Sequence, residues 1–125
     1  MTRLFSSTSI ETTLASGVNS SVTSMTVASG TGSALLGGVT LAAGNVDQFT
    51  VALDPDTTSE EIVFVTARSS DTFTISRGEA GTTNISHSAG ATVRHVLTSD
   101  DLDAFEDGLA NQQQVIATAF LYMGA

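Results

Sequence analysis

The chain has no cysteine, no lysine and no tryptophan, and it has only one proline and one tyrosine. The lack of cysteine excludes disulfides, thiolate nucleophiles and cysteine-based zinc sites within these 125 residues. Four arginines face thirteen acidic residues, which gives a formal net charge of -9. Proteins that bind nucleic acid neutralise phosphates with lysine and arginine, so we expect no nucleic-acid partner and no binding to an anionic membrane.

Long hydrophobic runs are also missing. The longest candidate for a membrane span is residues 34–43. It contains two glycines and a threonine and is too short to cross a bilayer. The first residues, MTRLFSSTSIETTL, have one arginine and no apolar run behind it, so no secretory signal is expected. With 41% hydrophobic and 14% charged residues, the composition is that of one globular domain with a modest core.

Alternation of apolar and polar residues predicts a mainly β fold. The run Ile62–Val65 is apolar throughout, which is typical of a strand covered on both faces. The sequence Asp54-Pro55-Asp56 predicts a turn. We expect a small antiparallel β-sandwich or barrel over residues 1–97. Its strands are expected at residues 9–14, 22–28, 48–53, 61–67, 72–76 and 91–97.

A glycine-rich segment, residues 30–46, interrupts this pattern. It offers few side chains for a local core, so we expect a loop or an extended arm. Together with residues 1–5, it is expected to become ordered only against neighbouring subunits. Leu35, Leu36 and Leu41 would then be the residues that contact a neighbouring subunit or another partner protein.

The period changes at Thr98, which can cap a helix with Asp101 three positions later. Residues 98–125 are therefore expected to form a helix that assembles the protein into a homo-oligomer, best a trimer. Its apolar stripe is spaced as a heptad with one polar member. The alternative is that the stripe covers the chain's own β domain. The expected interface residues are Leu102, Phe105, Leu109, Gln112, Ile116 and Met123.

The stretch ISRGEAGTTNISHSAGATVRHVL, residues 75–97, places Arg77, Glu79, His87 and His95 near each other. A catalytic site would need a nucleophile held and oriented beside its base, and the chain has no nucleophile elbow, phosphate loop or helical metal spacing. A structured loop explains more of the residues, with Arg77 paired to Glu79 or another acid. We therefore expect no catalytic residue, cofactor or metal. The predicted structural-loop residues are Arg77, Gly78, Gly81 and His87.

Four acids near the turn at Pro55, namely Asp54, Asp56, Glu60 and Glu61, raise the possibility of calcium. Their spacing does not fit an EF-hand loop, so a solvated acidic turn is the expected arrangement.

Residues 10–102 resemble a domain found in structural proteins of tailed bacteriophages. The resemblance is carried by TTLASGVNSSVTSMTVASG and by FTVALDPDTTSEEIVFVTARSSDTFTISRGEAGTTNISHSAGATVRHVLTSDDL. Its most specific part is Arg77-Gly78, Gly81-Thr82 and His87-Ser88-Ala89-Gly90. The resemblance implies a non-enzymatic virion protein, assembled in the host cytoplasm, that contacts the major capsid protein or other virion proteins.

The resemblance fits several places in the virion. The chain ends three heptads into the stripe, which favours a capsid decoration (cement) protein that stabilises the head over a long fibre. The alternative is a tail, neck or baseplate protein that anchors a fibre. A carbohydrate-binding or adhesin module is the third possibility, disfavoured by the lack of tryptophan, and an enzyme is the last.

Overall fold

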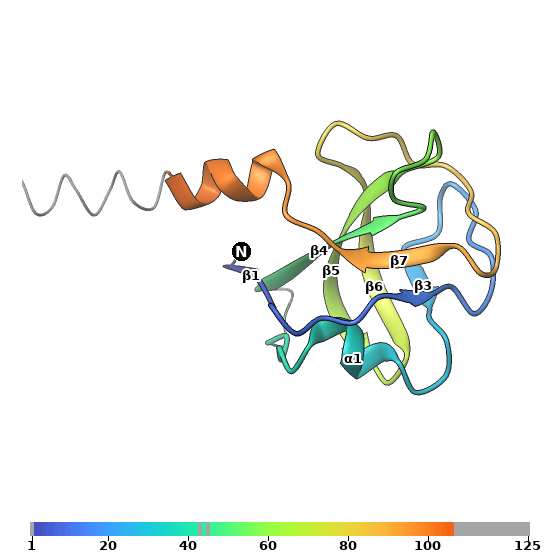
Figure 1. Ribbon diagram of the computed structural model, residues 1–125, viewed down its shortest axis with the longest axis horizontal. Helices are drawn as coiled ribbons and strands as arrows, with labels where there is room; N and C mark the ends of the chain where they lie inside the picture. Colours follow the sequence, from blue (N-terminus) through green and yellow to red (C-terminus); the bar gives the residue numbers. More distant parts are fainter. Residues whose placement is uncertain (1, 43, 45, 107–125) are drawn as a thin grey trace, which may run out of the picture.

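The computed structural model describes residues 2–42, 44 and 46–106 as a curled antiparallel sheet with one short helix beneath it and one projecting helix (Figure 1). The mainly β prediction is confirmed, and the form is a half-barrel. The sheet path is β2-β7-β4-β5-β6-β3, and β1 pairs in parallel with β4. The strands are β1 (Thr2–Leu4), β2 (Thr12–Thr13), β3 (Ser24–Thr26), β4 (Asp47–Leu53), β5 (Glu61–Ser69), β6 (Thr72–Glu79) and β7 (Thr92–His95).

The two edges of this path, β2 and β3, are tied to each other. A bridge joins Leu14 to Val27, and the amides of Ala15 and Ala28 donate to the carbonyls of Thr26 and Thr13, each at 2.9 Å. Edge strands with unpaired backbone groups favour aggregation, and this contact pairs such groups of the two edges within the chain. The curl therefore encloses one main core.

The apolar side chains that alternate along the strands line that core. Phe49, Val51 and Leu53 of β4 are fully buried, and they are joined by Met25 of β3 and by Val27, which follows that strand. On the opposite face of β4 and β5, Ala52, Ile62 and Phe64 form a second buried cluster, with Val96 packed against it. The prediction that Ile62–Val65 is covered on both faces is confirmed.

The glycine-rich segment was expected to be a loop or an extended arm, and this prediction is wrong for residues 32–36. Residues 32–36 form the helix α1 (Gly32–Leu36), and Leu35 and Leu36 are buried in the chain's own core. These two side chains therefore do not contact a neighbouring subunit. Leu41 is only partly buried and packs against the edge of the same core.

The start of α1 is held by a side chain from a distant hairpin. The carboxylate of Asp71, between β5 and β6, accepts the amides of Gly30 at 3.0 Å and Gly32 at 2.9 Å. The helix ends at Gly37, whose φ of 58° closes a left-handed cap. A Cβ at Gly37 would lie 2.7 Å from the amide nitrogen of Ser9, so this close approach needs glycine.

Residues 2–4 also belong to the chain's own fold, contrary to expectation. They form β1, which pairs in register with Asp47–Phe49 of β4. A parallel strand of three residues shows no alternation that could be recognised in the sequence.

The helix predicted after Thr98 begins at residue 99 and is described as far as residue 106. Its capping box is confirmed: the Asp101 amide donates to the Thr98 hydroxyl at 3.3 Å, and Asp101 accepts the Thr98 amide at 3.0 Å. Figure 1 shows this helix pointing away from the sheet. Leu109, Gln112, Ile116 and Met123 lie outside the described residues. Within the described part of the chain, no helix is long and apolar enough to cross a membrane.

Candidate functional site

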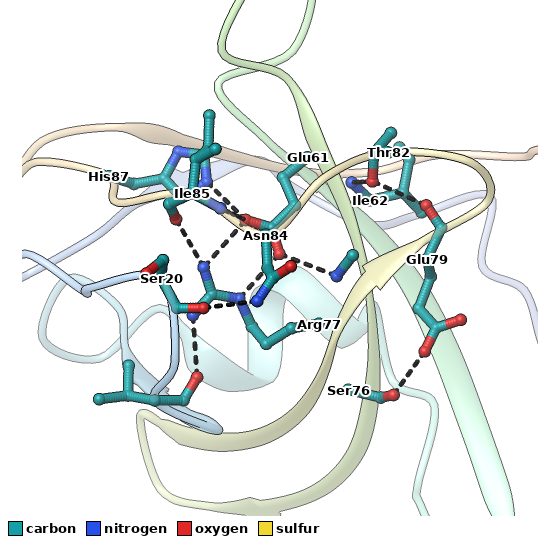
Figure 2. A network of polar contacts seen from close by, with 12 residues as sticks. Ser20, Glu61, Ile62, Ser76, Arg77, Glu79, Thr82, Asn84, Ile85 and His87 are labelled. Atoms are coloured by element: carbon teal, nitrogen blue, oxygen red, sulfur yellow. Dashed lines mark hydrogen bonds and ion pairs between the residues drawn. The ribbon is translucent and has the colours of Figure 1, made fainter.

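Arg77 and His87, two residues from the most specific part of the phage resemblance, meet at Glu61 in a buried polar network (Figure 2). Arg77 and Gly78 lie on β6, which runs through Glu79, so they are not in the loop where they were predicted. The Arg77 side chain is only 6% exposed. His87 comes from the following loop, where its backbone pairs with Val18.

The centre of the network is Glu61, the first residue of β5. Its side chain is fully buried, so the prediction of a solvated acidic turn is wrong for this residue. Arg77 binds it through two parallel bonds, Nε to Oε2 at 2.7 Å and Nη2 to Oε1 at 2.9 Å. The amides of Gly78 and Ile85 also donate to it, at 3.0 and 3.1 Å. Arg77 was expected to pair with Glu79 or another acid, and Glu61 is that acid; Glu79 accepts from the Ser76 hydroxyl at 2.6 Å.

These contacts set the charge state of Glu61. Burial opposes ionisation, but the hydrogen bonds from Arg77, His87 and the two amides outweigh it and lower the pKa of Glu61 from 4.5 to about 2. Glu61 is therefore an ionised carboxylate throughout the pH range near neutrality. The charge is balanced by an arginine in the fork geometry that suits a carboxylate.

His87 links Glu61 to a second carboxylate. Its Nε2 lies 3.0 Å from Glu61 Oε1, and its Nδ1 lies 2.7 Å from Asp54 Oδ2. A carboxylate only accepts, so each contact is a hydrogen bond when the facing ring nitrogen carries the proton. The ring is fully buried, and both nitrogens already face protein carboxylates.

Arg77 also joins two loops to the sheet. Nη1 donates to the carbonyls of Asn19 at 2.7 Å and Val22 at 2.9 Å, and Nη2 donates to the carbonyl of Ile85 at 2.6 Å. Figure 2 shows the Asn84 side chain beside it, donating to the Ser20 carbonyl at 2.7 Å. One guanidinium thus holds the loop of residues 15–23 against the loop of residues 80–91.

Both glycines of the motif have a backbone conformation that favours glycine. Gly78 and Gly81 have φ values of 60° and 80°, in the left-handed region that favours glycine. The Thr82 hydroxyl donates to the Glu79 carbonyl at 2.7 Å and accepts the Ile62 amide at 2.9 Å. A side chain thereby replaces part of the β5–β6 ladder where the strands separate.

The network of Glu61, Arg77, His87 and Asp54, which we call the clasp, holds loops and strands together. An aspartate–histidine pair orients a general base in many enzymes, but there the second ring nitrogen faces a hydroxyl or a water. In this protein it faces the arginine-bound Glu61. His95 does not join the network: its ring stacks on Phe49 with 3.9 Å between centroids. Among the described residues, no group of three or more histidine, aspartate or glutamate side chains is placed to hold a metal ion.

The sequence named Arg77, Gly78, Gly81 and His87 but did not identify Glu61 and Asp54 as their partners. One signal was present: Glu61 directly precedes the apolar run Ile62–Val65, so its side chain is carried into a buried strand. In a chain with only four arginines, a buried acid needs one of them.

A second ionic contact anchors the projecting helix. Asp101 is buried, and Arg3 donates to it at 2.9 Å from β1 while the Thr50 hydroxyl donates at 3.2 Å from β4. Burial opposes ionisation of Asp101, but the bonds from Arg3, Thr98 and Thr50 outweigh it and lower its pKa. The Arg3 guanidinium also lies 5.3 Å from the centroid of the Phe64 ring.

The low pKa of Glu61 predicts loss of stability in acid. The unfolded chain binds the proton near pH 4.5 and the folded chain only near pH 2, so the stabilisation is complete above pH 4.5 and is lost as the pH falls through that interval. The expected loss is about 3 kcal/mol. Urea unfolding at several pH values measures it. In Glu61→Gln the slope between pH 4.5 and 2 should be shallower, and an unchanged slope would exclude Glu61 as its source.

No protein-family model matches the chain, and no curated protein is significantly similar to it.

Proposed function

We propose that this protein is a non-enzymatic structural protein of a tailed-phage virion, most simply a capsid decoration protein that stabilises the head. The observation that supports the proposal is that the residues carrying the phage resemblance bond to other groups within the domain. Arg77, Gly78 and His87, which carry the resemblance, have their polar groups directed to Glu61, Asp54 and loop carbonyls inside the domain. Because these polar groups already bond within the domain and hold its loops together, the motif supports a structural role over a binding or catalytic one.

The proposed partners are further copies of the chain and the major capsid protein. The described part of the predicted heptad stripe supports self-association: Leu102 and Phe105 are 48% and 61% exposed. The alternative, in which the stripe covers the chain's own sheet, does not hold for these two side chains. A trimer remains the proposed assembly.

The alternative function is a tail, neck or baseplate protein that anchors a fibre. The same clasp and the same projecting helix suit it, because a helix that leaves the sheet can continue into a shaft (Figure 1). A carbohydrate-binding or adhesin module is the third candidate.

The position of the protein in virions of its phage tests the proposal. We expect the purified protein to bind heads that lack it at many equivalent positions, visible by electron cryomicroscopy, and to raise the temperature at which the heads release DNA. Density restricted to the neck or baseplate would contradict the decoration role and favour the alternative.

A further inference from the structure

Four exposed apolar side chains lie together where the projecting helix leaves the sheet. Phe5 is 46% exposed and Leu97 is 59% exposed, and they adjoin the exposed Leu102 and Phe105 of the helix. We call this set, Phe5, Leu97, Leu102 and Phe105, the apolar groove. Single exposed apolar residues are common on protein surfaces, but a contiguous group marks an interaction site.

The groove consists of two adjoining hollows. Each has a volume of about 280 Å³, and both are lined by Phe5, Asp101 and Phe105. Pockets for small ligands are typically about 300–1,000 Å³ and contain a few polar groups that orient the ligand. Here the polar side chains in the lining, Arg3 and Asp101, are bonded to each other. The groove therefore suits apolar side chains of another polypeptide.

The walls of the groove are held in place. The bond between Arg3 and Asp101 joins β1 to the first turn of the helix, and Thr50 binds the same carboxylate from β4. The Phe5 ring lies 6.5 Å from the ring of His95 on β7. The helix and the N-terminal segment thus form one preformed surface, which reduces the entropy lost on binding.

The geometry points to the helix of a second copy of this chain as the occupant of the apolar groove. Leu102 and Phe105 are the first two members of an apolar stripe whose sequence spacing continues as a heptad, and a heptad is the pattern of helices that pack on one another. The inference rests on the proposed self-association and extends it. The interface includes the β domain at Phe5 and Leu97, and Arg3 with Asp101 are positioning residues that set the angle of the helix.

Disulfide trapping tests the contact directly, because the chain has no cysteine of its own. Phe5→Cys protein is mixed with Leu102→Cys protein, dissociated and reassembled, and then oxidised. A disulfide requires Cβ atoms roughly 3.5–4.5 Å apart, so a docked neighbouring helix should give a covalent heterodimer of the two proteins on a non-reducing gel. A mass tag on the Phe5→Cys protein separates this heterodimer from a Leu102→Cys homodimer, which the heptad stripe itself could form. Tagged Ile10→Cys mixed with Leu102→Cys is the matched control and should give no heterodimer, since Ile10 is equally accessible, at 63% exposed, but its amide bonds to the Ala34 carbonyl of α1.

Charge substitutions measure the contribution of the groove to assembly. Wild type is expected to sediment with three times the chain mass of 12.8 kDa. Phe5→Asp and Leu97→Asp should each raise the concentration needed for assembly about tenfold or more, which corresponds to about 1.4 kcal/mol. Both variants should keep the wild-type circular dichroism spectrum, and Ile10→Asp should assemble normally.

The outcomes separate this inference from the proposed function. A wild-type monomer at all concentrations would defeat self-association itself and leave the groove to some other occupant. A wild-type trimer that forms no Phe5–Leu102 cross-link, and that survives both aspartate substitutions, would overturn the inference. The proposed virion role would then still stand.

Discussion

Replacing Arg77 with leucine is expected to destabilise the fold by about 3–5 kcal/mol, because it leaves the buried carboxylate of Glu61 without its counter-charge. The same change removes the donors to the carbonyls of Asn19, Val22 and Ile85, which hold two loops together. The loss is a large part of the roughly 5–15 kcal/mol that stabilises a typical domain. Urea denaturation followed by circular dichroism measures it.

Arg94→Leu is the matched control. Arg94 also binds two acids, Glu11 at 2.8 Å and Asp56 at 3.2 Å, but all three side chains are exposed. Exposed ion pairs contribute about 0–1 kcal/mol, so this variant should remain close to wild type. If Arg77→Leu and Arg94→Leu lowered the free energy of unfolding equally, burial would not be what makes the Arg77 network more stabilising than the Arg94 network.

A double variant separates charge from packing. Removing the acid together with the arginine, as Glu61→Met with Arg77→Leu, leaves no uncompensated buried charge. Replacing a buried ion pair with apolar side chains is often neutral or stabilising. We therefore expect the double variant to be more stable than Arg77→Leu alone. A double variant that is less stable than either single variant would indicate that the network contributes through its geometry and loop contacts rather than through charge compensation.

Replacing Leu35 with alanine is expected to destabilise the protein by about 2–5 kcal/mol, the usual cost of a large cavity in a core. Leu35 is fully buried among residues of the sheet. The result decides between two descriptions of residues 30–46. If the segment were ordered only in the assembled particle, the substitution would leave the dilute monomer unchanged.

Ser33→Ala provides the comparison on the same helix. Ser33 is exposed in α1, so its replacement should change the free energy of unfolding by less than about 0.5 kcal/mol. Hydrogen exchange of the amides in residues 33–37 gives a second measurement. Protection that is lost in Leu35→Ala and kept in Ser33→Ala would place α1 inside the cooperative fold.

The central strands could be read from the sequence because their side chains alternate. In β4, Phe49, Val51 and Leu53 alternate with other residues and face the core, and Phe73 and Ile75 do the same in β6. The capping box of Thr98 and Asp101 was equally visible, since both partners lie within one turn. These features depend on residues close together in the chain, where spacing alone determines which side chains can meet.

Tertiary structure decided the features that depend on distant partners. The carboxylate of Asp71 holds the start of α1 across about forty residues, and only the curled sheet brings the two together. The partners in the clasp are likewise brought together only by the folded sheet. Sequence composition predicts that Arg77 pairs with an acid, but the fold places Glu61 rather than the nearby Glu79 beside it. Local spacing determines periodicity and caps, whereas the choice among many acids is made by burial, which exists only once the chain has folded.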